Sequence, residues 1–520
     1  MRAWCRRGVS ERVPTGAGVG AALDAGGSLA EIAEDLQRDL TRAIASSGLD
    51  SVRIGLSVVD LRSGAVLADV QAQQPLIPAS NMKLLTSACA AKSLTPDFAF
   101  QTRFLLDGST LYVVGSGDPG LGDPVLLEGL PEPMDVEALL DFFARTIAKA
   151  QPGAIERIVI DDSAFDRQRV HPSWPQDQLQ YYYCAQVQGL NFHLNVVNVY
   201  ATPTTVNQPA RVVIEPAASG VEVVNTTTTA PRRTASGRVH SSIIHIRRDG
   251  PGNRLHVSGQ VSRSQSAPAA VDDMALLFGQ MLAERLDRLG VKVGQAHRLP
   301  GEAVERLGEG QSPTGTVVLV VRTPLEEVLK RCNTDSYNLH AEALFKALGR
   351  AVTGQPGSWT LGAATLRSIL VESLGPAAIE GLRVADGSGM SRDNAIAPAT
   401  ITALLAHMNA LSDRQARRIF FQSLARPGQG TLRRNFPTTG QLRTSLLAKT
   451  GYLNGVRAIS GVMAPKDRPD EPVLAFSILM NGFDAGQSLR TRELRNELVT
   501  IIDAAAARRA GALVIQNEAP

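Results

Sequence analysis

The feature that most constrains the fold of this chain is the combination of helix and strand patterns at both of its ends. Residues 28–48 begin with Ser28 and Glu31, which form a capping-box pattern, and continue with apolar residues on one helical face. Residues 51–70 then alternate in polarity around a polar turn, which is typical of a β-hairpin. Residues 442–482 have the pattern of adjacent strands, and a helical pattern follows them. We therefore expect the two ends of the chain to build one domain together.

The middle of the chain has a different character. From about residue 98 to 265, short β-like runs alternate with turns rich in Gly, Pro, Asn and Thr. A chain of 520 residues is also too long for one ordinary hydrophobic core. We predict a mixed α/β (α+β) fold in which residues 28–97 and 266–520 form a discontinuous domain with an antiparallel sheet flanked by helices. Residues 98–265 are expected to form a β-rich insertion of one or two subdomains, and residues 1–27 a flexible N-terminal segment.

The composition excludes several functional classes. The net charge of +3 provides no electrostatic basis for binding nucleic acid or an anionic membrane surface. The sequence has no run of eighteen apolar residues, so at most a peripheral association with a membrane is expected. The four cysteines form no C-x-x-C pair and the eight histidines form no H-E-x-x-H motif, so we predict no metal site, no cofactor and no disulfide framework. Cys89 and Cys332 are expected to be buried free thiols.

Three short segments carry the residues that predict chemistry. Ser80 and Lys83 lie three residues apart at the start of an apolar helical pattern. By themselves they are also compatible with a helix N-cap and a solvated surface charge. Two further segments favour catalysis, because Ser336 and Asn338 precede a helical stretch and Lys449 begins the tripeptide K-T-G on a predicted strand. Together the segments resemble S-x-x-K, S-D-N and K-T-G, the signature of penicillin-binding proteins and class A β-lactamases.

Acyl transfer to a serine explains why three dispersed segments are needed. The reaction requires a nucleophile, a proton acceptor, a proton route to the leaving amine and an oxyanion hole. Ser80 at a helix N-terminus is the candidate nucleophile, and Lys83, one turn later, is the candidate base. Lys83 can act as a base only when it is neutral, a state that burial and the charge of Lys449 would promote. Ser336 is the candidate proton relay, and Asn338 is expected to hold both the lysine and the substrate backbone.

The strand that carries K-T-G is predicted to bind the substrate. Gly451 allows a peptide to approach the strand edge closely, where it can add as an extra strand. The backbone N–H groups of Ser80 and Tyr452 are the candidate oxyanion hole.

Beyond these motifs, most of the chain from about residue 28 resembles one subgroup of penicillin-binding proteins. This subgroup is the D-alanyl-D-alanine carboxypeptidase/endopeptidase family of low-molecular-mass class C proteins, peptidase family S13. The long stretch between Ser80 and Ser336 matches the insertion that separates this subgroup from β-lactamases. The other matching segments are ADGSGMSRDN (385–394), GSGDP (115–119), GQGTL (428–432) and SILMNG (477–482).

The resemblance implies a penicillin-binding-protein/β-lactamase-like transpeptidase domain and a serine-type D-Ala-D-Ala carboxypeptidase. Such an enzyme acts on peptidoglycan stem peptides through an acyl-enzyme on Ser80, and β-lactams inhibit it covalently. Thr450 is then expected to bind the terminal carboxylate of the substrate. Two residues depart from the family pattern, because Tyr337 occupies the middle of the second motif and Tyr452 stands where the family usually has threonine. The second departure is expected to affect carboxylate binding more than acylation.

Other residues have two interpretations each. Asp386 and Arg392 either make a tight turn or help to shape the substrate pocket. Trp174 and Tyr181 to Tyr183 either pack locally in a surface loop or flank the stem peptide.

Two alternative functions differ in class from the leading one. One is a β-lactamase or esterase-like serine hydrolase, against which the long insertion argues. The other is a catalytically silent homologue that binds peptidoglycan, against which the complete set of motif residues argues.

A working peptidase of this family is expected outside the cytoplasmic membrane, and in the periplasm if the organism has an outer membrane. The reason is that peptidoglycan stem peptides are processed there. The first 27 residues lack the compact apolar core of an export signal, so we expect a mis-assigned start or an atypical signal.

Overall fold

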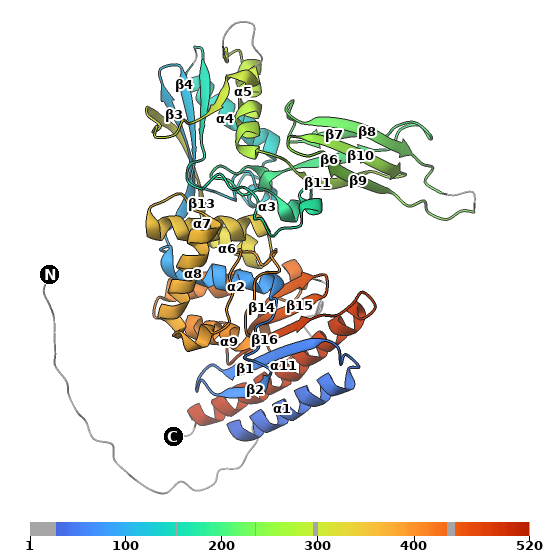
Figure 1. Cartoon of the computed structure of the whole chain (residues 1–520), viewed down its shortest axis with the longest axis vertical. Coiled ribbons are helices and arrows are strands. Elements are labelled where there is room, and N and C mark those ends of the chain that lie inside the picture. The colour runs from blue at the N-terminus through green and yellow to red at the C-terminus, as the bar shows by residue number, and fades with distance from the viewer. Residues whose placement is uncertain (1–27, 152, 234–235, 295–299, 434–441, 519–520) are drawn as a thin grey trace, which may run out of the picture.

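The computed structural model describes the chain outside a few short segments. These segments are 1–27, 152, 234–235, 295–299, 434–441 and 519–520, so the predicted flexible segment lies outside the described residues. The described part is elongated (Figure 1). A sheet with two long helices lies at one end, a layer of helices follows, and a second sheet and an arm of strands lie at the other end.

Both ends of the chain contribute to the first sheet, as the sequence predicts. Its order, β14-β15-β16-β1-β2, places the N-terminal hairpin beside the C-terminal strands, and all of its pairs are antiparallel. β14, which carries K-T-G, is the edge strand. The strands are β1 (Arg53–Asp60), β2 (Val66–Val70), β14 (Ser445–Leu453), β15 (Val456–Ala464) and β16 (Leu474–Asn481). This mixed arrangement confirms the predicted α/β fold class.

Helices cover both faces of this sheet (Figure 1). α1 (Leu29–Ser46) and α11 (Ser488–Glu518) pack on one face, and the predicted capping box forms at the start of α1. Its two hydrogen bonds join Ser28 and Glu31 at 2.8 and 3.2 Å. A layer of six helices lies on the other face. These helices are α2 (Met82–Ser93), α6 (Leu325–Asn333), α7 (Asn338–Thr353), α8 (Trp359–Leu374), α9 (Pro398–Asn409) and α10 (Arg414–Ser423).

The second sheet has the order β12-β5-β4-β3-β13 and packs against helices through a separate apolar core. Its elements are β3 (Ala99–Asp107), β4 (Thr110–Gly115), β5 (Arg157–Asp161), β12 (Val304–Arg306) and β13 (Thr316–Pro324), with helices α3 (Pro124–Glu128), α4 (Val136–Ala150) and α5 (Met274–Arg288).

The arm contains two three-stranded sheets, β8-β10-β9 and β11-β6-β7. Its strands are β6 (Val196–Thr202), β7 (Arg211–Glu215), β8 (Glu222–Thr229), β9 (Ile243–Arg248), β10 (Arg254–Val261) and β11 (Gln265–Ala270).

The second sheet includes strands that lie beyond the predicted end of the insertion. β13 pairs with β3 from Thr316↔Leu106 to Pro324↔Ala99, and β12 pairs with β5. α5 shares its apolar core with α4 and the sheet. We therefore propose that the inserted region extends from about residue 98 to about residue 324, instead of ending at residue 265. The discontinuous domain would then resume at α6.

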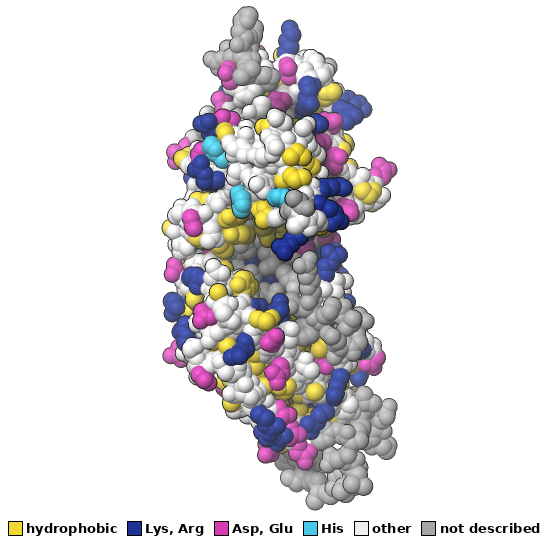
Figure 2. Space-filling view, turned by 90° about the vertical axis from the view of Figure 1, so that its right-hand side faces the viewer, with side chains coloured by type: hydrophobic (Ala, Val, Ile, Leu, Met, Phe, Trp, Pro, Cys, Tyr) yellow, Lys and Arg dark blue, Asp and Glu magenta, His cyan; other side chains and the backbone are white. Residues whose placement is uncertain are grey.

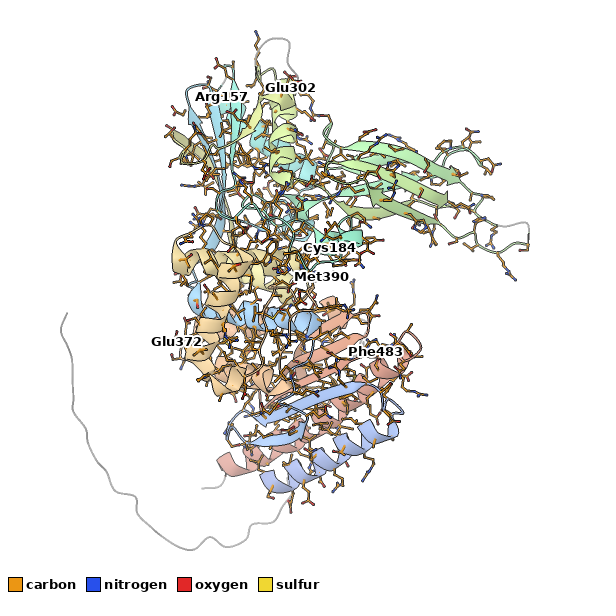
Figure 3. All side chains as sticks on the ribbon, in the orientation of Figure 1. Arg157, Cys184, Glu302, Glu372, Met390 and Phe483 are labelled. Carbon is orange, nitrogen blue, oxygen red and sulfur yellow. The ribbon has the colours of Figure 1, made fainter. Side chains whose placement is uncertain are left out.

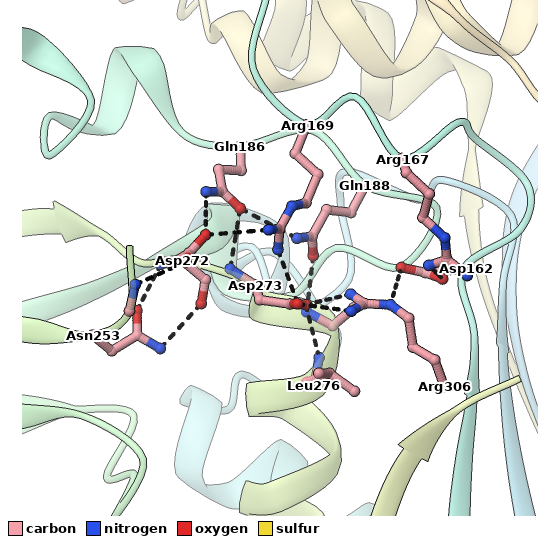
Figure 4. A network of polar contacts seen from close by, with 12 residues as sticks. Asp162, Arg167, Arg169, Gln186, Gln188, Asn253, Asp272, Asp273, Leu276 and Arg306 are labelled. Atoms are coloured by element: carbon pink, nitrogen blue, oxygen red, sulfur yellow. Dashed lines mark hydrogen bonds and ion pairs between the residues drawn. The ribbon is translucent and has the colours of Figure 1, made fainter. Parts of the chain in front are cut away.

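A network of ion pairs joins the arm to the second sheet (Figure 4). Asp273 caps α5 and accepts a hydrogen bond from Arg306 of β12 at 2.8 Å. Arg306 also donates to Asp162, which directly follows β5, at 3.0 Å. The neighbouring Asp272 bonds to Asn253 beside β10. These contacts fix the start of α5 between the two parts of the insertion.

The surface carries both signs of charge. On the face that Figure 2 shows, basic and acidic side chains are interspersed, in keeping with the small net charge. Among the described residues, no helix combines the length and the apolar character that a membrane span requires.

Candidate active site

The predicted nucleophile and base are in direct contact. Ser80 lies in the 3₁₀ turn Ala79–Asn81 that leads into α2, and it is partly exposed. Lys83 has no exposed surface, and its Nζ donates to Ser80 Oγ at 3.0 Å, to Asn338 Oδ1 at 2.7 Å and to the Ser388 carbonyl at 2.9 Å. The lysine is therefore held by three acceptors that belong to three different parts of the chain.

Burial changes the acid–base behaviour of Lys83. Removal from water disfavours the ammonium form and lowers the pKa of Lys83 to about 8, although the negative charges of Glu342 and Asp386 act in the opposite direction. A lysine with this pKa is neutral in a useful fraction of molecules near neutral pH. Lys83 can therefore accept the proton of Ser80.

Lys449 and Ser336 form the second half of the site. Lys449 on β14 is fully buried, and its Nζ donates to Ser336 Oγ at 2.8 Å and to the Thr450 carbonyl at 3.0 Å. Burial lowers the pKa of Lys449 well below its ordinary value, and the positive charge of Lys83 lowers it further. Ser336, two residues before α7 begins, has a φ of +64°, a backbone conformation that most residues avoid. The pair therefore places a hydroxyl and a second buried lysine amine near Lys83.

Asn338, the first residue of α7, connects Lys83 to the segment that contains Tyr183. Its Oδ1 accepts the hydrogen bond from Lys83, and its Nδ2 donates to the Tyr183 carbonyl at 2.7 Å. The structure thus brings together all five residues predicted to be catalytic. Cys184 and Met390, which are labelled in Figure 3, are close in sequence to Tyr183 and Ser388 of the site. They lie between the helical layer and the insertion.

The edge of β14 lies against the nucleophile. A Cβ on Gly451 would come within 2.8 Å of the Pro78 carbonyl oxygen and 3.1 Å of the Ser80 nitrogen, so only glycine allows this approach. Further along the same edge, Ala448 exchanges two backbone hydrogen bonds with Ala425. Because outward-pointing backbone groups recur at every second residue, Thr450 and Tyr452 present theirs at the same edge.

The side chain of Tyr452, which stands where the family usually has threonine, points away from the buried lysines. Successive side chains of a strand point to opposite faces, so Lys449 faces the helical layer and Tyr452 faces the other side. There the ring lies 5.2 Å from the guanidinium of Arg457, which donates to Thr491 of α11 at 3.2 Å. The ring of Tyr452 is therefore directed away from the buried lysines, and only its backbone lies at the catalytic edge.

Asp386, for which the sequence left a tight turn and the substrate pocket as alternatives, lies buried in its own loop. It has no exposed surface, and its carboxylate accepts hydrogen bonds from Trp174 Nε1 (2.9 Å) and from Asn394 Nδ2 (2.8 Å). The backbone N–H groups of Gly389 and Ser391 donate to it at 2.8 and 2.6 Å. Asp386 therefore closes the loop that presents the Ser388 carbonyl to Lys83, which agrees with the tight-turn interpretation.

Arg392 and the aromatic residues lie at different depths. Arg392 is exposed and donates to the Asn454 carbonyl at 2.5 Å, in the turn between β14 and β15. Trp174 is 2% exposed and packs in the interior, so it does not flank a substrate. Tyr181 and Tyr182 are 43% and 45% exposed and lie in the segment whose carbonyl binds Asn338. These two tyrosines are thus available at the surface beside the site.

Two features of the site were not predicted from the sequence. Glu342, one turn after Asn338 on α7, is fully buried and bonds to the backbone of the Ser388 loop. The signal for Glu342 was its i+4 spacing from Asn338 within an apolar helix. No sequence signal identified the Ser388 carbonyl, because backbone groups carry none. The predicted burial of Cys89 and Cys332 as free thiols is confirmed.

The geometry defines a class of protein. A serine at a helix start, a buried lysine one turn later, a serine–asparagine pair opposite them and K-T-G on an edge strand are the arrangement of penicillin-recognising serine acyltransferases. The chain belongs to the D-Ala-D-Ala carboxypeptidase 3 (S13) family, whose sequence model matches residues 36–504. This membership confirms the resemblance seen in the motifs.

Individual relatives agree with the family assignment. The chain is 29% identical over 488 residues to a D-alanyl-D-alanine carboxypeptidase from Actinomadura sp. (strain R39), with 88% of this chain and 83% of the relative covered. It is 25% identical over 461 residues to the D-alanyl-D-alanine carboxypeptidase DacB of Haemophilus influenzae, with 86% and 88% covered. The fold is similar to the crystal structure of penicillin binding protein 4 (dacB) from H. influenzae, with a TM-score of 0.67, 20% identity, and 90% of this chain and 99% of that chain covered.

Proposed function

We propose that this protein is a serine-type D-Ala-D-Ala carboxypeptidase that cleaves peptidoglycan stem peptides through an acyl-enzyme on Ser80. The observation that carries the proposal is the 3.0 Å contact between Ser80 Oγ and the Nζ of a fully buried Lys83. Family membership supports the same reaction.

Acylation begins with proton transfer from Ser80 to neutral Lys83. Ser80 Oγ attacks the carbonyl carbon of the penultimate D-alanine while Lys83 Nζ takes its proton, and a tetrahedral oxyanion forms. The N–H groups of Ser80 and Tyr452 are suited to stabilise that oxyanion, since both lie where Gly451 meets Ser80. The C–N bond then breaks, and the leaving amine takes a proton from the Ser336 hydroxyl, which Lys449 holds. The proton that Lys83 took from Ser80 replaces it, so Lys83 is neutral again before deacylation.

Deacylation uses a water molecule in place of the leaving amine. The water loses a proton to the same base, attacks the ester carbonyl carbon and releases the shortened peptide, and Ser80 recovers its proton. If the leaving amine belongs to a neighbouring stem peptide, the same steps cleave a cross-link, which is endopeptidase activity. β-Lactams would acylate Ser80 in the same way and inhibit the enzyme covalently; a structure of the H. influenzae relative is complexed with a novel β-lactam.

Substrate binding is proposed at the open edge of β14. An extended peptide can pair with the outward backbone groups of Thr450 and Tyr452 as an added strand. The Lys449 side chain and the exposed guanidinium of Arg392 are the groups that can attract the terminal carboxylate, whereas strand alternation places the Thr450 side chain on the same face as Tyr452. Because its substrate lies in the cell wall, we also propose that the protein acts outside the cytoplasmic membrane, in the periplasm where an outer membrane is present.

The test is covalent labelling by a fluorescent penicillin followed by intact-mass analysis. The proposal expects one adduct on the peptide that contains Ser80 and none in Ser80→Ala. A catalytically silent homologue would not be labelled, and a β-lactamase or esterase-like hydrolase would release the adduct within seconds. Release of D-alanine from a stem pentapeptide then separates a carboxypeptidase from these alternatives.

A further inference from the structure

The proposed reaction leaves one buried acid without a role. Glu342 on α7 has no exposed surface, and its carboxylate accepts three N–H donors. These are the indole of Trp359 at 2.8 Å and the backbone groups of Gly387 at 3.0 Å and Ser388 at 2.8 Å. A buried carboxylate is costly unless it is hydrogen-bonded, and here each donor belongs to a neighbouring segment of the catalytic domain.

Glu342 is connected to the base through a single residue. The backbone N–H of Ser388 donates to Glu342 at 2.8 Å, and its carbonyl accepts a hydrogen bond from Lys83 Nζ at 2.9 Å. The preceding Gly387 is held on its other side, where its carbonyl accepts a hydrogen bond from Thr86 of α2 at 2.7 Å. The position of the acceptor that orients Lys83 thus depends on the Glu342 carboxylate.

We propose that Glu342 is a positioning residue for Lys83, which holds the Ser388 carbonyl at the lysine and supplies a buried negative charge that favours its protonated form. This inference rests on the proposed function, in which Lys83 takes the proton of Ser80. It assigns Glu342 the task of setting the pH at which the base becomes active.

The surrounding charges support this task. Burial raises the pKa of Glu342 and lowers the pKa of Lys83, and the negative charge of Glu342 opposes the shift of the lysine. Loss of the glutamate charge would make Lys83 neutral at a lower pH. The other titratable groups around the pair are Cys332 of α6, Lys346 of α7, Asp386 of the adjoining loop and Lys449 of β14. The thiol of Cys332 is neutral in this range, because burial raises its pKa to about 11.

Glu342→Gln tests the charge with little change in shape. The rate of acylation by a penicillin would be measured between pH 5.5 and 10 for the wild type and the variant. We expect the midpoint of the acid limb to fall by about one pH unit, since an opposite charge at close range shifts a pKa by roughly that amount or more. The maximal rate should fall several-fold, because an amide NH₂ would face an N–H donor. A lower rate with an unchanged midpoint would mean that Glu342 is only structural and would overturn the inference.

Two further variants make the result unambiguous. Glu372→Gln removes an exposed carboxylate from α8 and should keep both the wild-type rate and the midpoint. Glu342→Asp keeps the charge but shortens the reach, and it replaces the glutamine variant if that variant does not fold. It should keep the wild-type midpoint with a reduced maximal rate; a shifted midpoint, or a wild-type rate, contradicts the inference. If the wild type forms no adduct at all, the proposed function itself fails.

Discussion

Replacement of Lys83 by alanine is the most direct test of the catalytic geometry. Lys83 is fully buried and its Nζ lies 3.0 Å from Ser80 Oγ, so its replacement removes the amine that is placed to accept the Ser80 proton. Loss of a general base typically costs 10²–10⁴-fold in rate, which corresponds to about 3–5 kcal/mol of activation free energy. We expect acylation by a penicillin to slow by this amount.

The pH dependence of the wild type adds a second magnitude. With a pKa of about 8, roughly one tenth of the Lys83 side chains are neutral at pH 7 and roughly nine tenths at pH 9. The base is the neutral form, so the acylation rate should rise about tenfold over this range. Lys83→Ala should lose that rise.

Stopped-flow acylation with a fluorescent penicillin measures both quantities. Lys92→Ala is the matched control, because Lys92 lies on the same helix but pairs with Glu372 of α8, away from the site. It should retain the wild-type rate and pH profile. If Lys83→Ala reacts within tenfold of the wild type, or if the wild-type rate is flat from pH 7 to 9, Lys83 is not the base.

Three further predictions follow from the same structure. Lys449→Ala should slow hydrolysis of substrates with a free terminal carboxylate more than hydrolysis of neutral ester analogues; equal losses in kcat/KM would exclude a carboxylate-binding role. Gly389→Ala should lower the melting temperature far more than Gly428→Ala. Both glycines have a positive φ, in which a side chain costs roughly 1–2 kcal/mol. Of the two, only a Cβ on Gly389 would overlap the Ala79 carbonyl oxygen. Similar melting temperatures for the two variants would show that the loop does not press on the nucleophile turn. Tyr452→Thr should leave acylation within about threefold of the wild type, since the ring faces away from the lysines; a tenfold loss would contradict that orientation.

Local sequence patterns did not predict which strands complete the second sheet at the end of the insertion. The short β-like runs predicted for residues 98–265 include β3, β4 and β5, but β13 was assigned to the other side of the division. Its register with β3 joins residues that are more than 200 positions apart. Pairing at that distance is decided by which edge is free and which core is incomplete, and local patterns contain neither.

The sequence by itself determined the features that depend on neighbours along the chain. The capping box of Ser28, the N-terminal hairpin and the one-turn spacing of Ser80 and Lys83 follow from helix and strand periods of a few residues. The motif pattern also indicated which distant segments must meet to perform acyl transfer.

Only the tertiary structure decided which groups face the reaction and how they are charged. The burial that lowers the pKa of Lys83, the enclosure of Asp386 within its loop, the ring of Tyr452 on the far face of the sheet and the link from Glu342 through Ser388 are all set by contacts between remote segments. Local sequence specifies where a side chain is attached, but the solvent and the charges around it come from other parts of the chain. Those surroundings determine whether a lysine is a base or a cation.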